Sequence, residues 1–218
     1  MTAEQLFTKR IRPIVRKSGT FTNTLTVMDK TKSIEAWIDV GYLLFATEGM
    51  DGLQVERLSR MVQRNKSCFY HYFGDLEVFC SKLLLQHEIW GRRFLDELRD
   101  VKNIEPDYFN LVLRFKLPVL FQMKLYESGS PDFRKVAERI DAAESEILQP
   151  VWTSYINFDG NERLAENYFN IVRDRAYMRL NAKNFTYDVL SDLFRSGKVL
   201  MDKIIESKLV IEKDEVLR

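Results

Sequence analysis

The stretch Leu58-Ser-Arg-Met-Val-Gln-Arg-Asn-Lys-Ser-Cys-Phe-Tyr-His-Tyr-Phe73 decides the fold of this chain. Leu58 and Val62 are four residues apart, which places them on one face of a helix, and Phe69 and Phe73 repeat that spacing. The polar run 63–65 between the two apolar pairs predicts a turn. The pattern therefore predicts a helix-turn-helix whose second helix is anchored by its phenylalanines.

The remaining side chains of this second helix are polar or aromatic and are expected to face outward or to flank the anchors. In a helix-turn-helix, the N-terminal residues of the second helix reach base edges in the major groove, while hydroxyl groups and backbone amides hold phosphates. Lys66 is the first residue of the predicted recognition helix and places an ammonium group at its N-terminus. The candidate DNA-contacting residues are Arg57, Arg64, Lys66, Ser67, Cys68, Tyr70, His71 and Tyr72.

Three consecutive segments resemble the TetR family of bacterial transcriptional repressors: Leu44-Phe45-Ala-Thr-Glu-Gly49, Val55-Glu-Arg-Leu58-Ser59, and Asn65-Lys-Ser-Cys-Phe-Tyr-His-Tyr-Phe73-Gly-Asp-Leu-Glu77. The resemblance covers about residues 34–79, and the C-terminal half carries no matching motif. It implies a repressor that binds double-stranded DNA at a palindromic operator. It also implies an unknown small-molecule effector that releases the operator.

The sequence departs from the family pattern at two positions. Gln63 stands where the family has a turn glycine, so the backbone there must either avoid a positive φ or accept strain. Leu76 stands where the family has a lysine at the start of its fourth helix. One expected phosphate contact is therefore absent.

Charge is distributed unevenly along the 218 residues, although the formal net charge is only +1. Residues 1–32 carry seven basic and two acidic side chains, so residues 33–218 have a net charge of −4. This excludes a generally basic nucleic-acid binder. The local positive footprint is a run without acidic residues that contains Arg57, Arg60, Arg64 and Lys66. We expect this local charge to attract DNA.

The first 32 residues do not belong obviously to the fold, and residues 19–27 alternate like a strand without a partner. Three interpretations stay open. The segment is a basic arm that contacts phosphates, a segment that precedes a true initiator at Met28, or an unrelated ordered extension.

Metal, cofactor and enzyme functions find little support in the sequence. The two cysteines, Cys68 and Cys80, lack zinc spacing relative to each other and to His71 and His87, so we expect no metal site. No nucleophile elbow or phosphate loop occurs, and no cofactor is expected. Because no apolar stretch reaches membrane-spanning length and no signal peptide is evident, a cytoplasmic protein without membrane association is expected.

The chain from Ser33 onward is predicted to be helical with short breaks. Ser33 and Asp75 are expected to cap helices 33–48 and 76–101, and Asn65 the recognition helix, which follows a helix at 54–63. Pro131 follows Ser130 as a first-turn proline, whereas Pro118 should kink its helix. The further helices are expected at 106–127, 131–149, 151–157, 161–181 and 185–209.

The kink at Pro118 suggests an effector pocket, because a bent core helix opens space. The primary candidates for its lining are Phe94, Arg114, Phe121 and Trp152, with Phe115, Tyr155, Gln122 and Arg173 as further members. The alternative is that these aromatic residues, at helical spacing, are ordinary core.

An apolar stripe along the last helix predicts a homodimer. Its members recur at three- and four-residue steps, and the interface candidates are Leu190, Leu193, Phe194, Gly197, Met201 and Ile204. A partner stripe of Leu164, Tyr168, Ile171, Val172 and Leu180 lies on the preceding helix. A two-fold dimer would present two recognition helices to half-sites about one helical turn apart. The alternative is that both stripes are covered within one chain.

The sequence thus predicts an all-α protein. After residues 1–32, an N-terminal three-helix DNA-binding domain at 33–80 is followed by a larger helical ligand-binding and dimerisation domain at 81–218. The leading function is a ligand-responsive, sequence-specific repressor. The alternative is an architectural or partner-binding helix-turn-helix protein without an effector, and an enzyme is not expected.

Overall fold

The computed structural model describes residues 24–158 and 160–216. Within these residues every regular element is a helix and no strand occurs, which confirms the all-α prediction. The chain divides into two compact units, unit 1 up to His87 and unit 2 from Glu88 onward. The division falls inside helix α5, Leu76–Leu98, rather than after Cys80.

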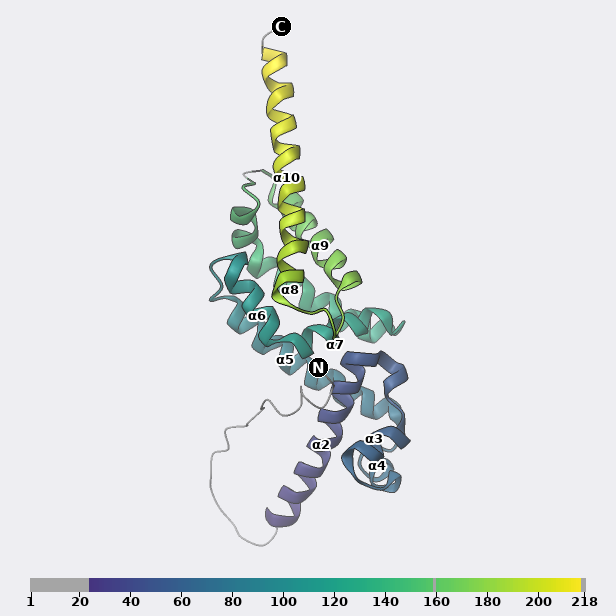
Figure 1. Cartoon of the computed structure of the whole chain (residues 1–218). Helices are drawn as coiled ribbons and strands as arrows, with labels where there is room; N and C mark the ends of the chain where they lie inside the picture. Colours follow the sequence, from purple (N-terminus) through teal and green to yellow (C-terminus); the bar gives the residue numbers. More distant parts are fainter. Residues whose placement is uncertain (1–23, 159, 217–218) are drawn as a thin grey trace. The chain divides into compact units, whose positions relative to one another are not determined.

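Unit 1 contains α2 (Thr24–Glu48), the short helix η1 (Gly49–Gly52), α3 (Val55–Val62), α4 (Lys66–Phe73) and the first half of α5. Helices α3 and α4 lie together beside α2 (Figure 1). Their shared core is fully buried and largely aromatic, with Trp37, Phe45, Leu58, Phe69 and Phe79 at its centre. Burial of this apolar face holds the two short helices in place.

The start of α2 corrects one prediction. The helix begins at Thr24 rather than after Ser33, so residues 24–27 are helical and not strand-like. The segment 24–33 contains no proline or glycine, and a serine caps a helix only where the preceding backbone leaves the helix. Of the proposed N-terminal arm, residues 1–23 lie outside the described residues, and the three interpretations of the arm stay open.

The caps of α4 and α5 lie at the predicted positions. The backbone amide of Val78 donates to Asp75 Oδ1 over 2.8 Å, which confirms Asp75 as the cap of α5. Asn65 occupies the N-cap position of α4, but its side chain makes no capping hydrogen bond. Gln63 has φ 57° and ψ 44°, so the chain accepts the left-handed conformation that glycine would adopt more easily.

Unit 2 contains the second half of α5, followed by η2 (Ile104–Tyr108), α6 (Phe109–Arg114), α7 (Lys116–Glu127), α8 (Pro131–Tyr155), α9 (Glu162–Arg179) and α10 (Tyr187–Val216). Helix α8 packs against α7, η2 and α9, and α10 packs against α6 and α9. Rings from four elements meet in the core: Phe109 and Phe194 have centroids 5.1 Å apart, and Trp152 and Phe169 5.5 Å apart.

The prolines of unit 2 have different effects. The predicted interruption near Pro118 is confirmed, because Phe115, with φ −93° and ψ 22°, separates α6 from α7. Pro118 then occupies the first turn of α7, where a missing amide costs little. The predicted break at Pro150 was wrong, since α8 continues through it to Tyr155. Pro150 is exposed, so the carbonyl that loses its partner can bond to water.

Candidate functional site

Helices α3 and α4 build the candidate DNA-binding site in unit 1. Phe69 is fully buried, and its ring lies 5.5 Å from Trp37 and 5.1 Å from both Phe73 and Phe79. These contacts fix one face of α4 against the unit. The opposite face of this eight-residue helix is left to solvent.

The predicted DNA-contacting residues all fall on α3, the turn or α4, and most are accessible. Tyr70 is 53% exposed even though its ring packs edge-on against Phe69. Five of the candidates are exposed, namely Arg64, Lys66, Ser67, Tyr70 and His71, and three are half-buried, namely Arg57, Cys68 and Tyr72. The structure thus brings the candidate residues together on two consecutive short helices and the turn between them.

Two of the four basic residues in the run 57–66 form ion pairs, although the run itself contains no acidic residue. Lys66 Nζ lies 2.8 Å from Glu56 Oε1, and Arg57 Nη2 donates to Glu48 Oε1 over 2.6 Å. The hydrogen bond that Lys66 donates to Glu56 raises the pKa of Lys66, and the hydrogen bond that Arg57 donates to Glu48 lowers the pKa of Glu48. Both acids lie outside the run and reach it through the fold.

The other two basic residues of the run 57–66 belong to neither ion pair. Arg60 and Arg64 are exposed, and no ion pair joins either of them to another residue in the described part of unit 1. Sequence reasoning counted Arg60 in the positive footprint but not among the contact residues. The unpaired positive charge of the site is therefore centred on the end of α3 and the turn.

The primary aromatic residues predicted to line an effector pocket are buried in the interior of unit 2. Phe94 and Phe115 make an edge-on ring contact at 5.4 Å, and Phe121 and Trp152 are completely buried. Arg114 does not face inward as predicted: its side chain is 65% exposed and its Nη2 lies 2.7 Å from Glu97 Oε2. The end of α6 turns it outward, where water solvates its charge.

A separate surface hollow of about 360 Å³ lies where α9 ends and α10 begins. It is lined by Arg179, Asn184, Val189, Asp192, Leu193 and Ser196, and none of the predicted pocket residues contributes to it.

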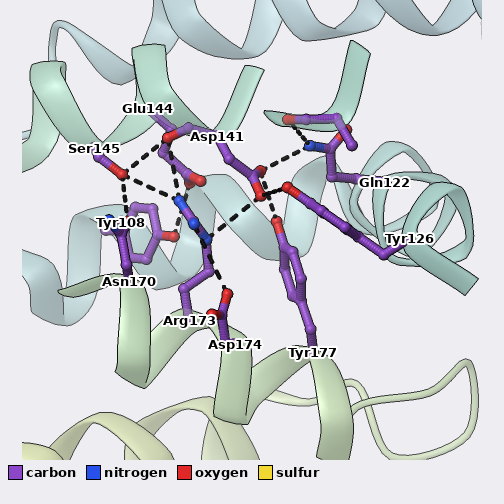
Figure 2. A network of polar contacts seen from close by, with 11 residues as sticks. Tyr108, Gln122, Tyr126, Asp141, Glu144, Ser145, Asn170, Arg173, Asp174 and Tyr177 are labelled. Atoms are coloured by element: carbon purple, nitrogen blue, oxygen red, sulfur yellow. Dashed lines mark hydrogen bonds and ion pairs between the residues drawn. The ribbon is translucent and has the colours of Figure 1, made fainter. Parts of the chain in front are cut away.

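Two of the polar residues suggested for the pocket, Gln122 and Arg173, meet instead in a buried cluster (Figure 2). We call it the Asp141 cluster, and its members are Tyr108, Gln122, Tyr126, Asp141, Glu144, Ser145, Asn170, Arg173 and Tyr177. They come from η2, α7, α8 and α9. Sequence reasoning named only Gln122 and Arg173 among them.

Asp141 is the centre of this cluster. It accepts hydrogen bonds from Gln122 Nε2 at 2.7 Å, from Tyr126 Oη at 2.6 Å and from Tyr177 Oη at 3.1 Å. The Nε atom of Arg173 lies 3.6 Å from Asp141 Oδ2, and the guanidinium also donates to the Asp141 carbonyl. Burial raises the pKa of Asp141, while Arg173 and the three donors act in the opposite direction.

Glu144 lies one turn farther along α8 and has fewer partners. Tyr108 Oη donates to Glu144 Oε1 at 2.9 Å, and both side chains are buried. Burial, together with the nearby Asp141, raises the pKa of the Glu144 carboxyl to about 7. This carboxyl therefore titrates near neutral pH.

The predicted dimer residues occupy the chain's own core. Leu190, Leu193, Phe194 and Met201 are buried. Gly197 is also buried, and a methyl group added to it would lie 3.0 Å from Val172. These five residues face α6 and α9 of the same chain, so they do not form a free surface; the Ile204 side chain lies outside the described residues.

Other apolar residues of the same two helices remain uncovered. Leu164, Ile171 and Met178 recur every seventh residue on α9 and are 53%, 63% and 80% exposed. Val199 and Leu200 are exposed on α10. Sequence reasoning placed Leu164 and Ile171 in the partner stripe of α9 but did not single out Met178.

No helix in the described part of the chain is long and apolar enough to cross a membrane. Among the same residues, no three side chains of histidine, cysteine, aspartate or glutamate are grouped so as to hold a metal ion. Both cysteines are free, and burial raises the pKa of the Cys80 thiol to about 11.

Neither protein-family models nor curated proteins match this chain.

Proposed function

We propose that this protein is a sequence-specific DNA-binding transcriptional regulator of the TetR type. The observation that carries the proposal is the arrangement of α3 and α4. Phe69 and Phe73 anchor α4 from within, while Ser67, Tyr70 and His71 stay accessible on its outer side. An exposed helix held rigidly behind a tight turn is the form in which side chains enter a major groove.

The charges of the site support a division of roles. Arg60 and Arg64, which have no acidic partner in the described part of unit 1, are suited to contacting phosphates on approach. Lys66 must leave Glu56 before it reaches a base edge. Because this pair is exposed, its separation costs little.

A homodimer is part of the proposal, with its interface moved to the outer face of α9. Leu164, Ile171 and Met178 form an exposed apolar stripe there at seven-residue intervals, whereas the residues predicted for the interface on α10 are used in the core. Regulators with a helix-turn-helix bind pseudo-palindromic sites because two-fold protein symmetry matches two half-sites.

Repression relieved by a small-molecule effector is the expected mode of regulation. Linkage requires that an effector weaken DNA binding by the same factor by which DNA weakens effector binding. The dense packing of Phe115, Phe121 and Trp152 favours a second candidate function, a helix-turn-helix protein without an effector. A screen for compounds that raise the melting temperature, repeated with bound duplex, distinguishes the two.

The primary test is selection of bound duplexes from a random pool by the full chain. We expect enrichment of a two-fold symmetric sequence with half-sites about 34–36 Å apart. The variant Arg64→Ala should recover fewer duplexes, whereas Arg134→Ala, an exposed arginine of unit 2, serves as the charge-matched control. A pool that stays random after repeated rounds would exclude sequence-specific binding.

A further inference from the structure

The Asp141 cluster buries an unequal number of opposite charges. Asp141, Glu144 and Arg173 are 3%, 5% and 9% exposed, so two carboxyl groups share one guanidinium. Asp174 also approaches Arg173, with 3.8 Å between charged atoms, but its side chain is 67% exposed and is solvated by water. Burial of an unbalanced charge is costly, so the cluster is most stable when one carboxyl group holds a proton.

Geometry identifies the carboxyl group that holds this proton. Asp141 accepts three side-chain hydrogen bonds and lies beside the Arg173 guanidinium, and each of these contacts favours its ionised form. Glu144 accepts one hydrogen bond, from Tyr108. The proton therefore belongs on Glu144.

Among the described residues, the groups around Glu144 offer no other source of compensating charge. The titratable and charged groups that face the cluster from the packed elements are Tyr108 from η2, Tyr126 from α7, Asp141 from α8, and Arg173, Asp174 and Tyr177 from α9. Burial raises the pKa of all three tyrosines, which stay neutral. Arg173 is the single cation among them.

We propose that the Asp141 cluster is a proton-operated device: release of the proton of Glu144 to water leaves two buried carboxylates against one guanidinium and loosens the packing of η2, α8 and α9. The device lies in unit 2 and goes beyond the proposed function, since it acts whether or not the protein binds DNA. Helix α9 carries Arg173 on its buried side and Ile171 on its exposed side, so loosening at the cluster also disturbs the exposed apolar stripe.

The direction of the pH effect follows from the two states of Glu144. Its pKa rises from an ordinary 4.5 to about 7 on folding. The contribution to stability is therefore complete below about pH 4.5 and is lost as the pH rises through 7. Between those limits the folding equilibrium changes on the order of 100-fold through this group.

The test is urea unfolding of the full chain at about pH 5 and about pH 8.5, for the wild type and Glu144→Gln. Glutamine imitates the protonated acid and still accepts from Tyr108. We expect the variant to gain on the order of 100-fold in folding equilibrium relative to the wild type as the pH rises between these values. Glu146→Gln, on the exposed side of α8, should change in parallel with the wild type. Parallel behaviour of Glu144→Gln would overturn the proposal.

A second measurement needs no substitution. Carbon-13 NMR of the native wild type should show the Glu144 carboxyl group titrating about two pH units above the exposed glutamates. If every glutamate carboxyl group titrated below about pH 5.5, Glu144 would be ionised at neutral pH and the device would not exist. This result decides the proposal even if Glu144→Gln fails to fold.

Discussion

The two units pair carboxylates with basic side chains in opposite surroundings. In unit 1, Lys66 meets Glu56 at the surface, with side chains 53% and 67% exposed. In unit 2, Arg173 meets Asp141 in the interior, with side chains 10% and 4% exposed. Water screens the first pair, so it separates easily and leaves its cation free for a ligand. The second pair cannot separate without leaving a buried charge unpaired, so it fixes helix positions and links them to protonation.

The largest effect should follow from breaking the buried pair. Arg173→Met leaves Asp141 and Glu144 buried without a cation, and we expect a loss of about 3–5 kcal/mol in the free energy of unfolding. Arg134→Met, on the exposed side of α8, should change it by no more than about 0.5 kcal/mol. Urea unfolding followed by tryptophan fluorescence measures both. Equal losses in the two variants would mean that the cluster contributes nothing specific.

The exposed apolar residues of α9, unlike the buried apolar residues of α10, are available for the proposed dimer interface. Ile171→Glu combined with Met178→Glu places charges in the proposed dimer interface, which should lose about 3 kcal/mol of association free energy. Because both residues are exposed in one chain, the variant should stay folded. Sedimentation should detect the resulting monomer. Ala142→Glu, exposed on α8, is the control, and a double variant that remains a dimer would place the interface elsewhere.

At the exposed pair, we expect an effect on binding rather than on folding. Lys66→Ala should weaken binding to the selected duplex by about 1–3 kcal/mol if the ammonium group reads a guanine edge. Tyr70→Phe should lower affinity for selected and scrambled duplexes alike, since a lost phosphate contact carries no sequence information. Titrations of both duplexes separate the two roles, and unchanged specific binding by Lys66→Ala would remove that residue from the site.

The smallest effect concerns the pair formed by half-buried Arg57 and exposed Glu48 at the surface of unit 1. The hydrogen bond from Arg57 lowers the pKa of Glu48, so its stabilisation is present above about pH 4.5 and is lost on further acidification. Glu48→Gln should therefore cost less than about 1 kcal/mol at neutral pH, and less still in high salt. This pH dependence is opposite in sign to that of Glu144. A stability loss at Glu48 as large as that at Arg173 would contradict the comparison.

Local patterns made unit 1 largely predictable from the sequence. The spacing of Phe69 and Phe73, the turn at Gln63 and the cap at Asp75 each depend on residues within one or two helical turns. The start of α2 was not predictable in this way, because Ser33 is compatible with either a cap or a helix interior. The pairing of Arg57 with Glu48 also escaped prediction, since it depends on how α3 packs against α2.

The Asp141 cluster joins residues that are far apart in the chain, and pattern reasoning missed most of it. Arg173 reaches the Asp141 carbonyl across 32 residues, a separation that only tertiary packing sets. One signal was nevertheless present. Asp141 and Glu144 continue the helical stripe that runs from Ala137 to Leu148, so charged side chains stood at core positions of α8. The aromatic residues assigned to a pocket were equally compatible with a filled core.

The most direct test of the central claim is a titration of the full chain with the selected duplex and with a scrambled duplex at one physiological salt concentration. DNA recognition through α4 predicts a preference for the selected duplex of at least about 1,000-fold. Lys66→Ala should reduce that preference, and Arg134→Ala should leave it unchanged. Equal affinity of the wild type for both duplexes would contradict the proposed function.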